Sequence, residues 1–321
     1  MSTPSQPILI LDVLNIFTRA YCAYPTVSAA GYQMGGCIGF LKMMRRFVEE
    51  QQPSAVYLAW EGGGSQRRRK LFSEYKQNRK PMKLNRFYED DIPDTEENRH
   101  HQILALLAML KCTPVCQLYV SDCEADDIIA HLCHGVFRNT EKVIASSDKD
   151  FYQLLNSNTK IYNVHKKLFV TEADVLSEFR VTAKNFALAK ALCGDPSDNI
   201  PGIKGLGFKT VAKLYPLLCS DQEILLQDLI DYAAAHKDES NIHKRVVEQQ
   251  EDLRRNWKLV FLDGGMLSAT QATSVDYVVS TSVPRIDRVG LMKQLIKEGV
   301  GNFDMEDFFY TFMCINGVQN V

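Results

Sequence analysis

The chain has 321 residues, of which 45% are hydrophobic and 24% charged, a globular composition with room for one large domain or two ordinary ones. The formal net charge of -2 excludes a uniformly basic nucleic-acid binder, so basic residues that bind nucleic acid must be clustered locally. Nine irregularly spaced cysteines argue against a paired secreted scaffold. No basic-then-apolar leader precedes Ile8, and no apolar run reaches the roughly 20 residues of a membrane helix. We therefore expect a cytoplasmic protein with no membrane partner.

Short apolar runs alternate with helical patterns through the first half of the chain, and carboxylates follow most of these runs. The runs and the acids that follow them are 7–11 with Asp12, 55–60 with Glu61, 114–120 with Glu124, and 142–146 with Asp148 and Asp150. Strands that alternate with helices predict a parallel α/β sheet, whose C-terminal strand ends meet at one edge. Any single acid, such as Asp12, could equally be a helix N-cap.

A basic stretch lies between residues 66 and 83, with Phe72 and Tyr75 interleaved. Its cations are Arg67, Arg68, Arg69, Lys70, Lys76, Arg79, Lys80 and Lys83. Such a run is commonly a solvated face, but cations bind phosphates and rings stack on bases, so the mixture favours nucleic-acid contact. The segment 76–95 is predicted to be a connection that carries function.

Two later clusters of acids differ in what they indicate. Glu124, Asp126 and Asp127 crowd one helix start, and like charges at that spacing destabilise each other unless a cation lies between them. Glu172 and Asp174 also open a helix, but Thr171 with Asp174 is a typical helix-start pair. We expect the second cluster to be structural.

The segment 193–210 places Asp195 and Asp198 directly before a glycine-rich turn and a helix that begins with Lys209 and Thr210. Carboxylates suit a hard divalent cation, and a glycine-lined turn lets backbone N–H groups approach a phosphate. Taken alone, the same residues are equally good turn and helix-cap composition.

So many acids at one sheet edge require cations, and oxygen-only ligands select Mg²⁺ or Mn²⁺ over zinc. Zinc pairs such as Cys112 and Cys116 lack a second pair at finger spacing. The chemistry that needs such a site is two-metal phosphoryl transfer, with Lys76 and Arg79 neutralising the scissile phosphate. The candidate ligands are Asp12, Glu61, Glu124, Asp126, Asp127, Asp148, Asp150, Asp195 and Asp198.

Five stretches together resemble the 5′-nuclease superfamily of flap endonucleases, polymerase I exonuclease domains and free-standing bacteriophage enzymes, and most of all its phage members. They are Asp12, Arg68–Arg79, Glu124–Asp127, Ser147–Asp150 and Gly194–Gly202. They occur in family order over about two-thirds of the chain. The C-terminal hundred residues match no motif, and we expect a free-standing enzyme without a polymerase domain.

The resemblance implies a PIN-like catalytic domain over 1–185, with a helical arch near 76–100, and a helical DNA-binding region over 186–321. A helix-hairpin-helix-type (H3TH) motif is implied at 186–218, with K⁺ held by backbone carbonyls. Two ions would be held by Asp12, Glu61, Glu124 and Asp126, and by Asp148, Asp150, Asp195 and Asp198, with Asp127 in support. Glu61 departs from the usual Asp.

Residue roles follow from the same resemblance. The implied catalytic residues are Lys76, Arg79 and Asp150. The implied DNA-binding residues are Arg19, Arg68, Tyr75, Lys76, Arg79, Lys83, Gly202, Lys204, Gly205, Gly207, Lys209 and Thr210.

The predicted function is that of a structure-specific 5′ nuclease with flap-endonuclease and 5′-3′ exonuclease activity on branched or duplex DNA, extending to RNA primers in RNA–DNA hybrids. Replication proteins are candidate partners, and the expected place of action is a bacterial cell, with the enzyme encoded by the bacterium or a phage. Two alternatives are an RNA-directed PIN-type ribonuclease, which the duplex-gripping turn disfavours, and a catalytically weak flap-binding scaffold protein. Mg²⁺-dependent cleavage of a labelled flap separates them.

Overall fold

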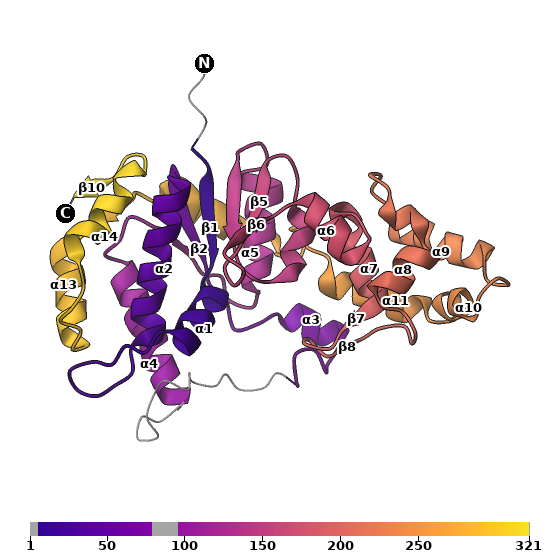
Figure 1. The fold of residues 1–321 in the computed structure, drawn as a ribbon, viewed down its shortest axis with the longest axis horizontal. Coiled ribbons are helices and arrows are strands. Elements are labelled where there is room, and N and C mark those ends of the chain that lie inside the picture. The colour runs from indigo at the N-terminus through magenta and orange to yellow at the C-terminus, as the bar shows by residue number, and fades with distance from the viewer. Residues whose placement is uncertain (1–5, 79–95, 321) are drawn as a thin grey trace, which may run out of the picture.

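The computed structural model describes residues 6–78 and 96–320, and Figure 1 shows the arrangement of their elements. Arg79, Lys83 and most of the predicted arch lie outside these residues. Among the helices of the two described stretches, none is long and apolar enough to cross a membrane.

A six-stranded sheet with the order β3-β2-β1-β4-β5-β6 forms the centre of the molecule. Its strands are β1 (Ile8–Asp12), β2 (Ala55–Ala59), β3 (Cys116–Leu118), β4 (Lys142–Ala145), β5 (Thr159–Asn163) and β6 (Leu168–Val170). The first five are parallel and β6 is antiparallel to β5. The predicted α/β class is confirmed, because buried apolar runs formed central parallel strands with helices on both faces.

The two faces of the sheet are covered by different helices. Leu9 and Leu11 of β1 pack in one core with the helices α1 (Val13–Ala23), α2 (Gly35–Gln51) and α4 (Glu96–Leu110), whereas Ile8 and Ile10 face a second core with α5 (Ala125–His131). This alternation follows from the two-residue period of a strand. Shorter elements complete the domain: α3 (Gln66–Leu71), a π-helical turn η1 (Leu132–Val136), η2 (Lys149–Leu154), α6 (Glu172–Phe179) and η3 (Ala183–Asn185).

A helical region follows the sheet and carries the glycine-rich hairpin. Its elements are α7 (Phe186–Cys193), β7 (Gly194–Asp195), β8 (Ile200–Pro201), α8 (Phe208–Leu214), η4 (Pro216–Cys219), α9 (Leu226–Ala235), α10 (Asn241–Glu248) and α11 (Gln250–Val260). The strands β7 and β8 pair antiparallel, and α7 packs against α8 and α11. The helix, hairpin and second helix therefore occur in the predicted order.

The C-terminal segment returns to the first domain, which differs from the predicted 186–321 region. Its elements are α12 (Ala269–Thr281), β9 (Arg285–Ile286), α13 (Arg288–Lys297), α14 (Met305–Thr311), η5 (Phe312–Cys314) and β10 (Gln319–Asn320). Helix α13 packs on α4 and α14 packs on α2, at the opposite end of the molecule from α9 and α10 (Figure 1). Apolar side chains such as Leu291, Phe308 and Phe312 bury themselves in the core beside Leu9, so burial drives the return.

Candidate metal and nucleic-acid site

The sheet-edge carboxylates, Asp12, Glu61, Glu124, Asp126 and Asp148, follow β1, β2 and β4 or begin α5. Asp12 ends β1 and caps α1, where it accepts a bond from the Asn15 amide at 3.3 Å. The Ser146 hydroxyl donates to Asp12 at 2.9 Å and accepts from the Asp148 amide at 3.0 Å. Ser146 therefore holds Asp12 and Asp148 at a fixed spacing. The pattern of acidic and basic residues in the sequence does not identify it.

The raised pKa values of Asp12 and Asp126 show that the sheet-edge carboxylates lie close enough to repel one another. Burial, together with the charge of Asp148, raises the pKa of Asp12 to about 7. Burial and the same Asp148 charge raise the pKa of Asp126 well above its ordinary value. Charges that shift each other this strongly lie close together. Glu61 accepts a bond from the Ala125 amide at 3.3 Å, which keeps its carboxylate at this edge.

Glu124 lies 2% exposed at the centre of the cluster. Its Oε2 lies 2.8 Å from the Lys76 ammonium and accepts from the Tyr75 hydroxyl at 3.1 Å. Its Oε1 is buried and has no hydrogen-bond partner among the residues the structure describes. A buried carboxylate oxygen without a partner is costly, and a bound cation would supply the missing interaction.

The hairpin carboxylates, Asp150, Asp195 and Asp198, each place one oxygen within 4.8 Å of the others. Lys190, which comes from α7, forms ion pairs with Asp150 and with Asp195, the latter at 2.7 Å. Although burial opposes it, Lys190 and Ser197 lower the pKa of Asp195. The same two carboxylates raise the pKa of Lys190 against the effect of burial. Lys190 was not identified from the sequence. It could have been found as the single cation about one helical turn before the acidic hairpin.

Tyr75 joins the two clusters. Its hydroxyl lies 3.1 Å from Glu124 Oε2 and 3.3 Å from Asp198 Oδ2, and the charge of Asp148 acts on Asp150 as well as on Asp12. The predicted ligands from distant parts of the chain therefore converge on one place. A site with two groups of oxygen donors is present, and its chemistry suits hard divalent cations.

Asp127 is one predicted ligand whose carboxylate is directed elsewhere. Both of its oxygens accept bonds from the buried Arg68 guanidinium, at 2.8 and 2.7 Å, and one also accepts from the Glu124 amide at 3.0 Å. Asp127 therefore caps α5 and holds Arg68, and of its two predicted roles this geometry favours support over direct metal ligation.

The prediction that Arg68 binds DNA is also contradicted. Arg68 is 1% exposed and donates to the Leu259 carbonyl at 3.1 Å, so it braces α3 against α11. Tyr75, 4% exposed, is likewise too buried to stack on a base. Arg67 donates to the carbonyls of Gly265 and Met266. Part of the basic run thus fastens the helical region to the domain, which a count of charges cannot reveal.

The hairpin requires glycine at two positions. Gly194 has φ +75°, and a Cβ there would lie 2.2 Å from the Gly202 amide. A Cβ on Gly202 would lie 2.0 Å from the Cys193 carbonyl. The close backbone approach therefore excludes side chains. Beyond it, Lys204, Gly205, Gly207 and Lys209 are exposed and Thr210 is half-buried, which leaves them accessible to a partner. Arg19 lies on α1, with a guanidinium nitrogen 2.7 Å from His165 Nδ1.

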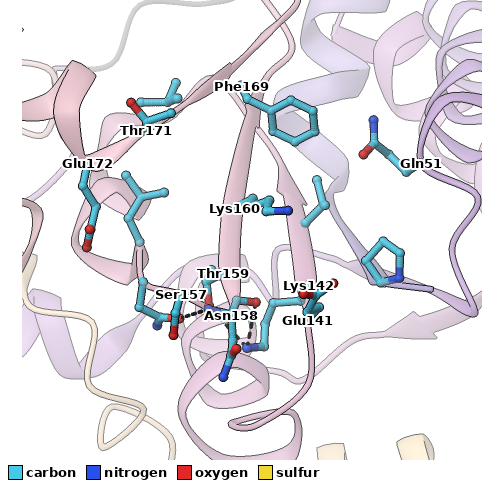
Figure 2. Close-up of a pocket in the computed structure, with 15 residues that line it drawn as sticks. Gln51, Glu141, Lys142, Ser157, Asn158, Thr159, Lys160, Phe169, Thr171 and Glu172 are labelled. Atoms are coloured by element: carbon cyan, nitrogen blue, oxygen red, sulfur yellow. Dashed lines mark hydrogen bonds between the residues drawn. The ribbon is translucent and has the colours of Figure 1, made fainter. Parts of the chain in front are cut away.

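A cavity of about 590 Å³ lies at the opposite edge of the sheet (Figure 2). The ammonium of buried Lys142 donates to the Thr159 hydroxyl at 3.3 Å in this cavity. Lys160 and Phe169 also line it. None of the predicted ligands lines this cavity. The candidate metal ligands therefore gather at the acidic edge and not at this cavity.

The profile of the 5′-3′ exonuclease N-terminal resolvase-like domain matches residues 7–180, which is more than half of the chain. The chain belongs to this family. It is a nuclease with the α/β fold of the 5′ nucleases, as the sequence resemblance predicted.

Individual relatives agree with this placement in the 5′-3′ exonuclease family. Flap endonuclease Xni of Shewanella halifaxensis is 29% identical over 259 residues, which cover 79% of this chain and 92% of that protein. DNA polymerase I of Caldicellulosiruptor bescii is 32% identical over 267 residues, or 78% of this chain, and the match spans only 30% of the polymerase.

Solved structures share the fold at low identity. The bacteriophage T5 D15 flap endonuclease, in a complex with DNA and metal ions, superimposes with a TM-score of 0.63 at 18% identity, covering 91% of this chain and 97% of that one. Human GEN1 in complex with Holliday junction DNA gives a TM-score of 0.58 at 10% identity, covering 97% of this chain and 71% of that one.

Proposed function

We propose that this nuclease is a structure-specific 5′ nuclease that removes 5′ flaps and short oligonucleotides from DNA, using two divalent ions. The observation that carries the proposal is the meeting of the sheet-edge and hairpin carboxylates, which Tyr75 joins through bonds to Glu124 and Asp198. The hairpin that would grip the duplex itself contains Asp195 and Asp198 and continues into the glycine-rich segment 202–207.

The residues present fit divalent metal ions. The donors are all oxygens, Glu124 Oε1 lacks a partner among the described residues, and Asp150, Asp195 and Asp198 converge within 4.8 Å. One ion would be held by Asp12, Glu61, Glu124 and Asp126, and the other by Asp148, Asp150, Asp195 and Asp198. We propose Mg²⁺, for which Mn²⁺ can substitute. Bound ions of this kind activate a water and stabilise the leaving oxygen in phosphodiester hydrolysis.

The chain's own residues position the substrate. Lys76, with its ammonium 2.8 Å from Glu124, can turn toward a scissile phosphate and offset its charge, and we assign Arg79 the same role. Lys190 holds Asp150 and Asp195 in place. The exposed Lys204 and Lys209 contact phosphates, while Gly202, Gly205 and Gly207 let the backbone approach the duplex. Carbonyls of the same hairpin would hold K⁺.

Names of similar proteins support the substrate class. Xni is a flap endonuclease, and the T5 enzyme was crystallised with DNA and metal ions. We extend the proposal to RNA primers paired with DNA and to replication proteins as partners.

Cleavage of a 5′-labelled flap substrate, with and without Mg²⁺, tests the proposal. We expect metal-dependent release of the flap, with slower cleavage of single-stranded DNA and of single-stranded RNA of the same sequence. Preference for the RNA would support the PIN-type ribonuclease, and flap binding without cleavage in any metal would support the scaffold protein. Either result would contradict the proposal.

A further inference from the structure

The turn at residues 73–78 brings Tyr75 and Lys76 to the carboxylates, and it is fastened to the Asp198–Asn199 turn of the hairpin. The Lys76 amide donates to the Asp198 carbonyl at 2.9 Å. This backbone bond lies beside the Tyr75 hydroxyl contact to the Asp198 carboxylate. The 73–78 turn and the Asp198–Asn199 turn, more than a hundred residues apart in sequence, are therefore joined directly beside the proposed metal ligands.

The side chain of Asn199 provides the rest of the connection. Its Nδ2 donates to the Glu74 carbonyl at 2.9 Å, and its Oδ1 accepts from Asn78 Nδ2 at 2.9 Å. One amide thus uses its donor and its acceptor on both ends of the 73–78 turn. We call these two bonds, with the Lys76–Asp198 backbone bond, the Asn199 clasp.

The backbone conformation of Lys76 and Asn199 indicates what the clasp stabilises. Lys76 and Asn199 both have φ +60°, a left-handed conformation that asparagine tolerates but that is unfavourable for lysine. Contacts that hold a turn offset the cost of this conformation, and at Lys76 these contacts are the bonds of the clasp. The left-handed turn at Lys76 is what carries its ammonium to 2.8 Å from Glu124.

We propose that Asn199 is a positioning residue that couples the DNA-gripping hairpin to Lys76. The inference rests on the proposed function, in which Lys76 offsets the charge of the scissile phosphate. The clasp fixes the position of Lys76 relative to the hairpin. When the hairpin binds a duplex, the Lys76 ammonium is therefore already placed for the scissile phosphate. Asn199 is not itself among the proposed metal ligands or phosphate contacts.

Three variants separate the clasp from ordinary stability. Asn199→Gly keeps the freedom to adopt positive φ and removes both side-chain bonds. Asn199→Asp keeps the acceptor for Asn78, but it turns a charged oxygen instead of a donor toward the Glu74 carbonyl. Lys167→Gly is the matched control, because Lys167 has φ +58° in an exposed turn between β5 and β6. It makes the same kind of backbone change away from the clasp.

Hydrogen exchange without DNA or metal tests the clasp directly. Amides in 73–78 should exchange on the order of 10-fold faster in Asn199→Gly, which loses two neutral hydrogen bonds. Asn199→Asp should also exchange faster than the wild type, because its carboxylate repels the Glu74 carbonyl that Asn199 bonds, and Lys167→Gly should match the wild type. Wild-type exchange in Asn199→Gly would overturn the inference.

Kinetics tests the coupling to Lys76. At saturating flap DNA and metal, Asn199→Gly should lower the single-turnover rate about 10-fold, and its flap affinity should stay at the wild-type value. In the Lys76→Ala background, Asn199→Gly should have no further effect, because its only route to the rate is removed. Multiplicative effects would overturn the inference. Absence of flap cleavage by the wild type would instead contradict the proposed function, and the exchange result would still decide the clasp.

Discussion

Asp12, Asp126 and Asp148 repel one another at the sheet edge, whereas Asp150 and Asp195 share the ammonium of Lys190. Burial and neighbouring charge raise the pKa values of Asp12 and Asp126, while Lys190 and Ser197 lower that of Asp195 against burial. Asp150 lies between the two cases, because burial raises its pKa to about 7 although Lys190 opposes the rise. The sheet-edge carboxylates therefore keep negative charge that a ligand must offset, even with Lys76 beside Glu124, whereas the ammonium of Lys190 bridges Asp150 and Asp195. Each prediction below changes one side of this difference.

The largest effect should come from the hairpin carboxylates. Asp150→Asn removes a proposed ligand, and we expect the single-turnover rate to fall by about 1,000-fold or more, because electrostatic stabilisation is commonly the largest catalytic contribution. Flap binding, measured by fluorescence anisotropy, should stay nearly intact. Asp174→Asn is the control, since Asp174 caps α6 through Thr171. Wild-type cleavage by Asp150→Asn would remove Asp150 from the mechanism.

A smaller effect is expected from the cation beside the sheet-edge carboxylates. Lys76→Ala should slow flap cleavage by about 100-fold, because a charge that stabilises the transition state is lost. Loss of the ion pair with Glu124 should also lower the melting temperature, so the rates are compared at a temperature at which both proteins are folded. Lys70→Ala, an exposed change in the same basic run, should cleave normally. Equal kinetics for both variants would mean that the whole run is solvated surface.

Removal of the Lys190 ammonium should lower the stability of the metal-free protein. Lys190→Met leaves Asp150 and Asp195 without their ammonium, and the free energy of unfolding of the metal-free protein should fall by about 3 kcal/mol, as for other buried ion pairs. Mn²⁺ should restore most of this loss. Lys166→Met, whose partner Glu178 is exposed, should cost less than about 1 kcal/mol. Equal losses in urea titrations would contradict the contrast between the clusters.

How far the sequence predicts this molecule depends on the kind of interaction. The strands, the sheet class and the convergence of the acids follow from apolar periodicity and from carboxylates at strand ends. The roles of Arg68 and Tyr75 do not, because a guanidinium that pairs with Asp127 inside the core has the same sequence signal as one that faces DNA. The return of α13 and α14 to the first domain depends on long-range burial, which leaves no local motif. Lys190 and Ser146 act through positions that only the folded chain defines.

The smallest effect concerns the helical region, where stability should depend on pH and not on metal. Burial and the charge of His236 lower the pKa of His243, which lies beside the Tyr215 hydroxyl at 3.1 Å. The unfolded chain then binds more protons below pH about 6.5, so stability is retained above that pH and falls as the pH drops further. His243→Gln should flatten this part of the pH profile of the unfolding free energy. An unchanged profile would exclude His243 as its source.

The most direct measurement is anomalous diffraction from a crystal soaked in Mn²⁺. Our account predicts two peaks, one among Asp12, Glu61, Glu124 and Asp126 and the other among Asp148, Asp150, Asp195 and Asp198, with the Lys190 ammonium displaced from the second. Peaks elsewhere, or no peak in a protein that still cleaves flaps in the presence of a chelator, would contradict the central claim that these acids hold the ions that cut the strand.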